Sequence, residues 1–339
     1  MLLYEAPAAA GTLSEKTDKA AFWFAAEEHV MRDLAPGEPV LMLWRTRDTA
    51  MVGAHQIAEA EVDRAYAEAA GIDIVRRASG GGAIFTDAGT LLYTIILPHR
   101  EGMDPKDVVR ERLAGPVTRA LSKLGVTAAL EGRNDLLIGG RKFSGIAQCL
   151  SGGYLLSHGS LLFDADLAKL ARVLTVGREK IETKAVPSVR ARVTNITEHT
   201  QERDIAAFRQ ALVESWAEDG PLGRRVFGEG SLSAIGAIMR GKYENPSWTY
   251  GHAPAFSIRN KARFPGGGVE AFLSVEGGKV ASVRITGDFL ALRPASEVEG
   301  ALLGAPYEKE ALASALARAR AAEALGSITE EELLSVLLV

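Results

Sequence analysis

The sequence predicts a mixed α/β protein of the α+β kind with two domains, and three observations support this. Short runs of apolar and β-branched residues alternate with longer segments whose apolar side chains recur at helical spacing. The chain has 339 residues, which at roughly 100–200 residues per domain suggests two domains. Proline and glycine cluster between Tyr243 and Phe256, and the pattern of elements changes there. We therefore expect a large domain at residues 1–250 and a small α+β domain at residues 255–339.

The composition narrows the class of protein further. Apolar residues make up 47% of the chain and charged residues 24%, which are ordinary values for a globular protein. The formal net charge of −4 argues against a strongly basic nucleic-acid binder, so we expect no nucleic-acid partner. The single cysteine, Cys149, excludes a disulfide framework and fits a reducing compartment. No apolar run is long enough to span a membrane, and the N-terminus does not resemble a signal peptide. These features predict a cytoplasmic protein without membrane contact.

The first elements of the large domain follow from hydrophobic spacing. A helix is predicted at residues 17–33, because apolar side chains recur there every three or four residues. Two strands are predicted at residues 40–44 and 49–53, each a short apolar run that ends at a polar residue or a glycine. A second helix is predicted at residues 58–70, since Gly71 stands where a helix commonly ends.

The rest of the large domain is predicted to alternate strands and helices in the same way. Residues 72–77 and 90–97 are β-branched or apolar runs typical of strands, and residues 105–124 form a long amphipathic pattern typical of a helix. Between residues 127 and 163 the pattern is that of strands broken by glycine turns. Three further helices are predicted at residues 165–174, 204–217 and 231–240.

The small domain is predicted to contain a hairpin followed by two helices. The strands are residues 269–276 and 279–285, which flank Gly277 and Gly278, a two-residue turn signal. The helices are predicted within residues 294–303 and 307–325. About 85 residues are enough for a domain with a core of its own.

A glycine-rich segment is the first candidate for a ligand site. Gly80, Gly81 and Gly82 follow Arg76 and Arg77 at the end of a predicted strand. Successive glycines allow a backbone to approach a ligand and to direct several N–H groups at an anion, and arginine offers paired donors to phosphate or carboxylate. The alternative is a glycine-rich connection with solvated arginines. The segment lacks the third glycine of the dinucleotide-binding fingerprint, and the chain contains no Walker A sequence, so neither motif is present.

A predicted hairpin is the second candidate. Asn134 and Asp135 stand at the start of a strand and offer oxygen ligands of the kind that Mg²⁺ prefers. After a turn at Gly139 and Gly140 the chain returns, so we expect Lys142 to lie beside Asp135. Lysine is a compact charge that can stabilise a phosphoryl oxygen as it becomes anionic. The alternative is an exposed lysine near a turn.

Two later segments are more ambiguous when each is taken alone. His158 follows a run of strand residues and is either a ligand contact or a buried histidine of the core. The segment from Lys184 to Asn195 is basic, and residues 131–192 contain ten lysines and arginines against six acidic residues. Positive charge concentrated there favours an anionic ligand such as a nucleotide, or an acidic partner.

Taken together and in order, these segments resemble the lipoate-protein ligase A family of the biotin/lipoate ligase superfamily. The matching sequences are Arg-Arg-x-Ser-Gly-Gly-Gly-Ala-x-Phe, Gly-Arg-Asn-Asp-Leu with Arg-Lys-x-Ser-Gly, His-Gly-Ser-Leu-Leu, and Ser-Val-Arg-Ala-Arg-Val-Thr-Asn. The resemblance covers nearly the whole chain. It implies a mixed-sheet catalytic domain like that of biotin and lipoate ligases, followed by a small α+β accessory domain. It also implies an enzyme that uses ATP to convert lipoate to lipoyl-AMP and then transfers the lipoyl group to a lysine.

The resemblance implies roles for individual residues and for partners. Lys142 matches the catalytic lysine, which contacts both the adenylate phosphate and the lipoate carboxyl group. The positions near Mg²⁺ and the triphosphate are matched by Asn134 and Asp135. The other ATP and adenylate positions are Arg77, Gly82, Ala83, Ile84 and Phe85. The wall of the lipoyl pocket is matched by Ser79, Gly80, Gly81 and His158. The implied partners are the lipoyl domains of 2-oxoacid dehydrogenase E2 subunits and the glycine cleavage H protein.

The sequence departs from the family pattern at two positions. Thr86 stands before Asp87 where the family usually has histidine, and Ala54 replaces a usual arginine. We expect both changes to reshape the acyl pocket, which leaves the preference between lipoate and octanoate open.

Three alternatives remain open at this point. A biotin-protein ligase shares the pattern of residues 134–146 but would carry an arginine-rich Gly-Arg-Gly-Arg loop, which this chain lacks. An octanoyl or lipoyl transferase of the same superfamily would form a thioester on a cysteine, for which Cys149 is available, but such transferases normally lack the C-terminal domain. The third alternative is a lipoyl-domain binder without enzymatic activity.

Overall fold

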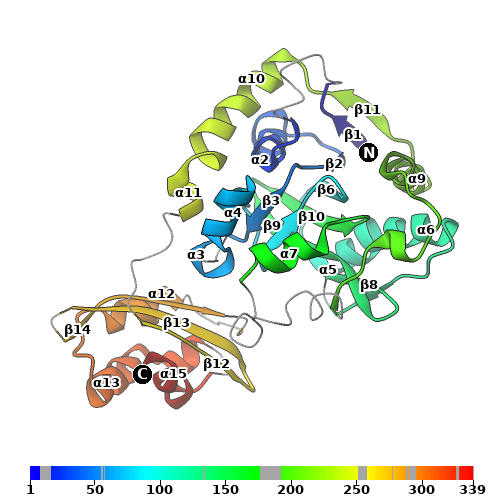
Figure 1. The fold of residues 1–339 in the computed structure, drawn as a ribbon. Coiled ribbons are helices and arrows are strands. Elements are labelled where there is room, and N and C mark those ends of the chain that lie inside the picture. Colours follow the sequence, from blue (N-terminus) through cyan, green and yellow to red (C-terminus); the bar gives the residue numbers. More distant parts are fainter. Residues whose placement is uncertain are drawn as a thin grey trace. The chain divides into compact units, whose positions relative to one another are not determined.

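The computed structural model describes residues 1–7, 17–54, 56, 58–132, 134–175, 192–250, 258–276, 278–287, 289, 295–325 and 328–338. The chain divides into two compact units, Met1–Tyr250 and Gly251–Val339 (Figure 1). The first contains a large mixed sheet with helices, and the second a small antiparallel sheet with helices. The mixed α/β class expected from the sequence is therefore confirmed.

An eight-stranded sheet runs through the first unit in the order β11-β1-β2-β6-β10-β9-β8-β7. Its first three strands are parallel, because β1 pairs in parallel with both β11 and β2, and all other pairs are antiparallel. The strands are β1 (Leu2–Glu5), β2 (Val40–Trp44), β6 (Thr90–Pro98), β7 (Ala129–Glu131), β8 (Asp135–Ile138), β9 (Arg141–Ser151), β10 (Tyr154–Leu162) and β11 (Gly223–Val226).

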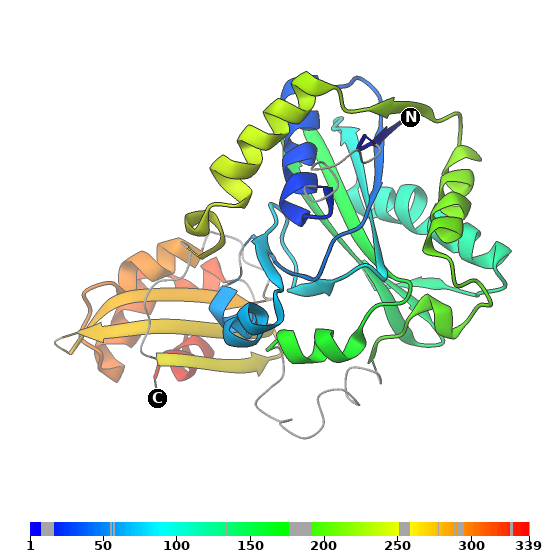
Figure 2. The same ribbon diagram turned by 45° about the horizontal axis from the view of Figure 1, so that its top comes forward.

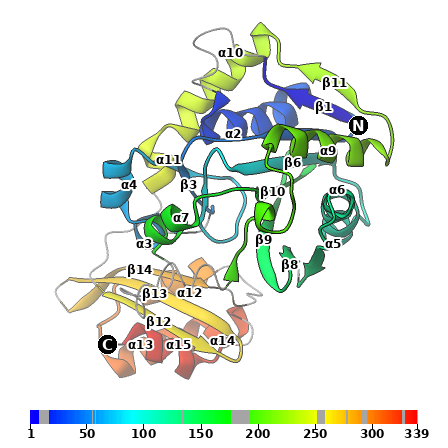
Figure 3. The same cartoon turned by 45° about the vertical axis from the view of Figure 1, so that its right-hand side comes forward.

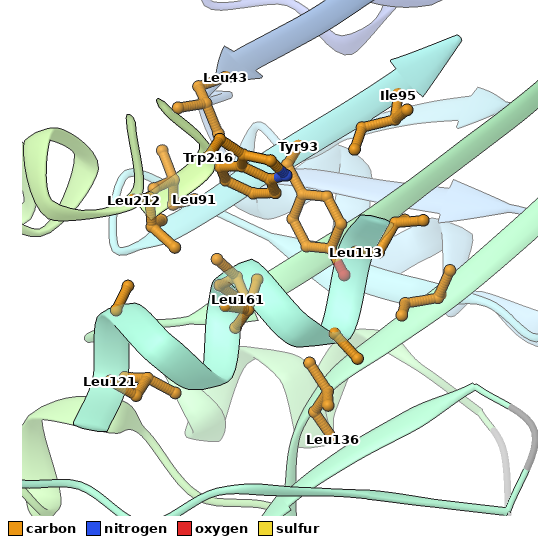
Figure 4. Close-up of a cluster of buried hydrophobic side chains, with 14 of the residues drawn as sticks. Leu43, Leu91, Tyr93, Ile95, Leu113, Leu121, Leu136, Leu161, Leu212 and Trp216 are labelled. Atoms are coloured by element: carbon orange, nitrogen blue, oxygen red, sulfur yellow. The ribbon is translucent and has the colours of Figure 1, made fainter. Parts of the chain in front are cut away.

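Helices cover both faces of this sheet (Figures 2 and 3). On one face, α2 (Ala20–His29) and α10 (Glu229–Ile238) pack over a core that contains Phe24 and Trp44. On the other face, α6 (Gly115–Lys123) and α9 (Ile205–Ala217) pack over a second core. Figure 4 shows the second core, in which the rings of Tyr93 and Trp216 lie with their centroids 5.8 Å apart.

A second, three-stranded sheet lies in the same unit, in the order β4-β3-β5. β3 (Thr49–Val52) pairs in parallel with β4 (Asp73–Arg76) and antiparallel with β5 (Ile84–Thr86). Phe85 and Val52 form part of a small core with residues of the neighbouring helices. These helices are α3 (Ala58–Glu61), α4 (Arg64–Ala70) and α7 (Leu167–Val173). The segment that joins β4 to β5 is the glycine-rich loop singled out in the sequence.

Several predicted helices are interrupted in the structure. The helix predicted at residues 58–70 is two helices, because the carboxylate of Asp63 accepts a hydrogen bond from the backbone N–H of Tyr66 and starts α4 anew. Gly71 ends α4 in the left-handed conformation, as predicted. Other long helices contain π-helical turns: η2 (Val30–Leu34) extends α2, η3 (Val109–Ala114) separates α5 (Pro105–Val108) from α6, and η6 (Met239–Tyr243) extends α10.

In the described part of the second unit, four helices pack against a three-stranded antiparallel sheet. The strands are β12 (Ile258–Phe264), β13 (Gly267–Glu276) and β14 (Lys279–Gly287), in that order. The helices are α12 (Ala295–Leu302), α13 (Lys309–Ala319), α14 (Ala321–Ala324) and α15 (Glu330–Leu337). Its core consists of residues from β13, β14 and these helices. The predicted hairpin is confirmed, although Gly277 of its turn lies outside the described residues.

A few elements were not predicted from the sequence. They are the strands β1, β5, β11 and β12 and the helices α11 (Pro246–Tyr250), η5 (Ile196–Glu198) and α15. None of the described helices combines the length and the apolar character that a membrane crossing would need.

Candidate active site

One pocket of the first unit brings together many of the residues singled out in the sequence. Its apolar wall consists of Phe24, Trp44, Met51, Ile84 and Leu92. Its polar lining consists of Arg77, Asn134, Lys142, His158 and Ser160. The lining is completed by Gly81, Gly82, Gly145, Ile146, Ala147 and Gly159. An apolar wall beside a few polar groups suits a ligand that has a hydrocarbon part and an anionic part.

Some predicted residues lie behind the pocket surface instead of in its lining. Ser79 is fully buried, and the side chain of Phe85 belongs to the core next to the small sheet. Gly80 and Ala83 also do not line the pocket. The ligand contacts predicted for these four residues therefore remain predictions, and their side chains are not part of the pocket wall.

The predicted pair of Lys142 and Asp135 forms at the polar end of the pocket. Lys142 Nζ lies 2.8 Å from Asp135 Oδ1, with the two side chains 42% and 38% exposed. The hairpin of β8 and β9 creates this contact, as expected, because Asp135 opens one strand and Lys142 lies near the start of the other. Both charges are partly solvated, so they can exchange partners when an anionic ligand arrives.

Asn134 is fixed against the neighbouring strand by two hydrogen bonds. Its side-chain Nδ2 donates to the carbonyl oxygen of Ile146 at 2.7 Å, and its own carbonyl accepts from the N–H of Ile146 at 2.9 Å. Its side-chain oxygen takes no part in these two bonds. The next residue along the chain, Asp135, adds a carboxylate.

The side-chain oxygens of Asn134 and Asp135 suit a Mg²⁺ site. No group of three or more histidine, cysteine, aspartate or glutamate residues that could bind a metal ion occurs among the described residues. Mg²⁺ typically takes one or two carboxylates and completes its shell with water and substrate phosphates. Asn134 and Asp135 fit that pattern, in which the metal arrives with a nucleotide.

The structure corrects the expectation for Arg76. Its side chain is fully buried, and its guanidinium donates to backbone carbonyls of two segments, among them those of Gly53 at 2.7 Å, Gln56 at 2.6 Å and Thr249 at 2.6 Å. An arginine with its donors used in this way cannot also bind a ligand phosphate. Arg76 is a structural residue that links β4 to the loop after β3 and to α11.

Arg77 lies at the pocket but is also engaged by the backbone. It is only 4% exposed, and its Nη2 donates to the carbonyls of Gly80 and Gly82 at 2.8 and 2.7 Å. Burial lowers the pKa of its guanidinium to about 10, so it remains charged at neutral pH. Arg77 therefore shapes the glycine loop (residues 79–82), while its direct contact with a nucleotide remains a prediction.

The glycine loop is also in close contact with the loop after β3. A Cβ atom added at Gly53 would lie 2.1 Å from the carbonyl oxygen of Gly81, a distance that atoms cannot adopt. The N–H of Ala54 donates to the carbonyl of Ser79 at 2.9 Å. Gly81 itself has φ of +88°, a conformation that favours glycine. These contacts fix the loop that borders the pocket.

A buried hydrogen-bonded chain supports the same loop. Ser79 Oγ lies 2.6 Å from His158 Nε2, and His158 Nδ1 lies 3.1 Å from Glu27 Oε1. A carboxylate can only accept, so in the neutral ring Nδ1–H donates to Glu27 and Nε2 accepts from the Ser79 hydroxyl. The order Ser–His–Glu is that of a hydrolase triad, but Ser79 is fully buried and cannot reach a substrate. The chain instead connects the glycine loop to β10 and α2.

The hydrogen bonds between Ser79, His158 and Glu27 explain the position of His158 and show that Glu27 belongs to the site. His158 is both nearly buried and part of the pocket lining, so it satisfies both readings left open by the sequence. Glu27 was missed, because it belongs to α2 and is 131 residues away from His158. The available signal was that Glu27 directly follows the apolar run Ala20–Ala26 of α2, and in the structure it is only 2% exposed.

The two departures from the family pattern lie away from the pocket lining. Thr86 is buried, and its Oγ1 lies 2.7 Å from that of Thr46. Neither Thr86 nor Ala54 lines the pocket. The two residues therefore make no direct contact with a ligand in this pocket, and the expectation that they reshape it remains a prediction.

Cys149 is not placed for thioester chemistry in this pocket. It lines a different cavity, together with Lys242 and Tyr243. Burial raises the pKa of its thiol to about 11, and an attacking cysteine needs a lowered pKa. Other residues of the sequence patterns lie outside the described part of the chain: Arg133 and the basic segment from Lys184 to Ala191.

Comparisons with known proteins point to a single family. The family "lipoyl protein ligase A/B catalytic domain" matches residues 19–217, and "bacterial lipoate protein ligase C-terminus" matches residues 253–337. The lipoate-protein ligase LplJ of Bacillus subtilis is 33% identical over 319 residues, which cover 92% of this chain and 95% of that protein.

Solved structures with the same fold are also lipoate ligases. A bipartite lipoate protein ligase from Thermoplasma acidophilum, studied with its E2 lipoyl domain, has a TM-score of 0.65 and 27% identity over 76% of this chain and 98% of that one. A lipoate-protein ligase A bound with ATP has a TM-score of 0.61 and 26% identity over 75% of this chain and 98% of that one. The sequence and the fold together assign this chain to the lipoate-protein ligase family.

Proposed function

We propose that this enzyme attaches lipoate to lysine side chains of lipoyl domains in two steps, with lipoyl-AMP as the intermediate. Lipoate and ATP react to lipoyl-AMP and pyrophosphate, and the acceptor lysine then displaces AMP. The observation that carries this proposal is the pocket whose apolar wall meets the Lys142 ammonium, because lipoate has a hydrocarbon chain and a single carboxylate. Its acceptors are the lipoyl domains of 2-oxoacid dehydrogenase E2 subunits and the glycine cleavage H protein.

The first step brings two anions together, which explains the need for Lys142. A free carboxylate does not acylate an amine, because its oxygen is a poor leaving group, whereas a mixed anhydride with AMP does. The lipoate carboxylate attacks the α-phosphorus, and negative charge grows on the phosphate oxygens. A fixed ammonium stabilises that charge most in the transition state. No nucleophilic side chain is required, which agrees with the raised pKa of Cys149.

The remaining lining residues have complementary roles in this proposal. Phe24, Trp44, Met51 and Leu92 contact the apolar part of lipoate, and His158 borders it on the polar side. The backbone of residues 82–85 and Arg77 bind the adenylate. Asn134 and Asp135 would hold a Mg²⁺ ion, which would offset phosphate charge. Residues 1–250 are the catalytic domain and residues 255–339 the accessory domain. The single unpaired cysteine suits the cytoplasm as the site of action.

The test uses the purified 339-residue chain, Mg-ATP, lipoate and a lipoyl domain that has not been modified. We expect the mass of the lipoyl domain to increase by one lipoyl group only when ATP and lipoate are both present. Replacing lipoate with biotin should abolish the increase. An increase without ATP from an octanoyl- or lipoyl-thioester donor would contradict the proposal in favour of a transferase. Pyrophosphate release without any acceptor would separate the first step from the second.

A further inference from the structure

We propose that Gly145 is a positioning residue for the reaction. The Lys142 ammonium lies between Gly145, which has no side chain, and the carboxylate of Asp135. We call these two residues the lysine seat. This inference rests on the proposed function, because it assumes that Lys142 stabilises the forming adenylate.

A β-bulge directs Lys142 to the seat. Leu136 pairs with Ser144 and Leu137 pairs with Lys142, so Phe143 is an extra residue on β9. Phe143 and Ser144 are both buried, although neighbouring side chains on a regular strand point to opposite faces. Without the bulge, Lys142 would share the face of Ser144. With the bulge, it lies on the face of Gly145, which lines the pocket.

The seat has no room for a side chain at residue 145. A Cβ atom built on Gly145 would lie 3.0 Å from both Cε and Nζ of Lys142 and 3.9 Å from Asp135 Oδ1. Unstrained carbon contacts are about 3.5–4.0 Å, so a methyl group at this position must displace the ammonium. The three atoms nearest to this Cβ all belong to side chains, and the end of a lysine side chain is flexible. The fold should therefore tolerate the substitution, while the position of the charge changes.

The chemical consequence follows from the sensitivity of catalysis to position. Lys142 Nζ must stay within contact distance of the phosphate and carboxylate oxygens as they react. A displacement of about 1 Å of a reacting group can lower a rate by about 100-fold, and the shift forced here is smaller. We expect Gly145→Ala to lower kcat for lipoyl-AMP formation about tenfold. The KM values for ATP and lipoate should change less than about twofold, because the interaction strengthens mainly in the transition state.

A double-mutant cycle separates this role from simple obstruction, since Gly145 also lines the pocket and an added methyl group could block a substrate. Pyrophosphate release with ATP and lipoate, without acceptor, is measured for wild type, Gly145→Ala, Lys142→Ala and the double variant. The matched control is Gly37→Ala, whose added Cβ meets nothing within 4 Å. If Gly145 acts through Lys142, the double variant should be no slower than Lys142→Ala.

The other possible results refute either the lysine seat or the catalytic role of Lys142. If Gly145→Ala slows the reaction by the same factor with and without Lys142, the methyl group obstructs a substrate and the lysine seat is refuted, while the role of Lys142 stands. Wild-type activity of Gly145→Ala also refutes the seat, as does unfolding of Gly145→Ala when Gly37→Ala folds normally. If Lys142→Ala releases pyrophosphate at the wild-type rate, the catalytic role of Lys142 in the proposed function is wrong, and the seat fails with it.

Discussion

Among single residues, Lys142 has the clearest expected effect. It is partly exposed and belongs to none of the hydrophobic cores, so its removal should cost little stability. Its charge should matter most when the phosphate oxygens are most negative. We expect Lys142→Ala to lower kcat for pyrophosphate release by about 10²–10³-fold, the usual effect of removing one electrostatic group from an active site.

The control for Lys142→Ala is Lys142→Arg, which keeps the positive charge. It should restore activity only in part, because a planar guanidinium is larger than an ammonium and cannot take the place of a compact point charge between two oxygens. Thermal unfolding of both variants verifies the fold. Near-wild-type pyrophosphate release from a folded Lys142→Ala enzyme would contradict the assignment.

Cys149 gives a second prediction at this scale. Burial raises the pKa of its thiol to about 11, compared with about 8.5 for an unperturbed cysteine. At pH 8 the thiolate population should therefore be about 100-fold or more below that of an exposed cysteine, and it should rise as the pH approaches 11. The measurement is the rate of alkylation by iodoacetamide between pH 7 and pH 10.

Activity provides the companion measurement for the cysteine. Cys149→Ser should keep ATP-dependent lipoylation at close to the wild-type rate, because no thioester forms in the proposed reaction. A folded Cys149→Ser protein without activity would instead support a transferase mechanism.

The sequence predicted the local part of the site but not the parts that depend on tertiary contacts. Asp135 and Lys142 come together through a short hairpin, and the turn residues between them are visible in the sequence. The β-bulge at Phe143 was not predicted, because residue types alone do not reveal an extra residue in a strand pair. Glu27 was missed, and Arg76 was given a wrong role, since the partners of both lie far away in sequence.

At the scale of elements, the contact between two loops makes a specific prediction. A methyl group at Gly53 would overlap the backbone carbonyl of Gly81, and neither loop can move without breaking hydrogen bonds of Arg76 or Arg77. Gly53→Ala should therefore lower the free energy of unfolding by about 1–3 kcal/mol, as overpacking typically does. Denaturant unfolding measures the change.

Gly82 is the matched control for Gly53. It belongs to the same contact region, but an added Cβ there meets nothing within 4 Å. Gly82→Ala should change the stability by less than about 0.5 kcal/mol, whatever its effect on ligand binding. Equal destabilisation by the two substitutions would show that loop flexibility, and not the contact with Gly81, determines the result.

The elements that the sequence did not reveal share physical reasons. β1 and β11 are four-residue strands that pair in parallel at the edge of the large sheet, and β11 is mostly exposed, so neither has a clear hydrophobic pattern. β12 is an edge strand whose exposed residues are Arg259, Lys261 and Arg263, which make it look like a polar loop. The buried strands β2 and β6 were predicted almost to the residue, because their apolar runs are continuous.

At the scale of the whole molecule, each compact unit has its own hydrophobic cores. Among the residues that the structure describes, the cores of Met1–Tyr250 consist of residues of that unit, and the core of Gly251–Val339 consists of residues of the second unit. A fragment of residues 1–250 should therefore unfold cooperatively by itself, as a domain with its own core does.

The exact end of such a fragment should matter because of Arg76. Its Nε and Nη2 donate to the carbonyls of Trp248 and Thr249, and the indole N–H of Trp248 donates back to the Arg76 carbonyl. A fragment of residues 1–245 lacks these acceptors and leaves a guanidinium near the core without them. Each buried polar group that loses its partner costs about 1–3 kcal/mol. The shorter fragment should be less stable than residues 1–250 by about 3 kcal/mol, which corresponds to a Tm lower by about 6–12 °C.

Replacing Arg76 with methionine distinguishes this cause from a general effect of truncation. In residues 1–250, Arg76→Met removes hydrogen bonds to Gly53, Gln56 and Thr249 and should lower the Tm. In residues 1–245, the same substitution removes a charge that has already lost part of its partners, so it should be neutral or raise the Tm. Thermal melts of the four proteins give the comparison. If Arg76→Met lowers the Tm of both fragments equally, the carbonyls of α11 do not stabilise the buried guanidinium. The first unit then does not depend on residues 246–250 for the stability of its glycine-rich site.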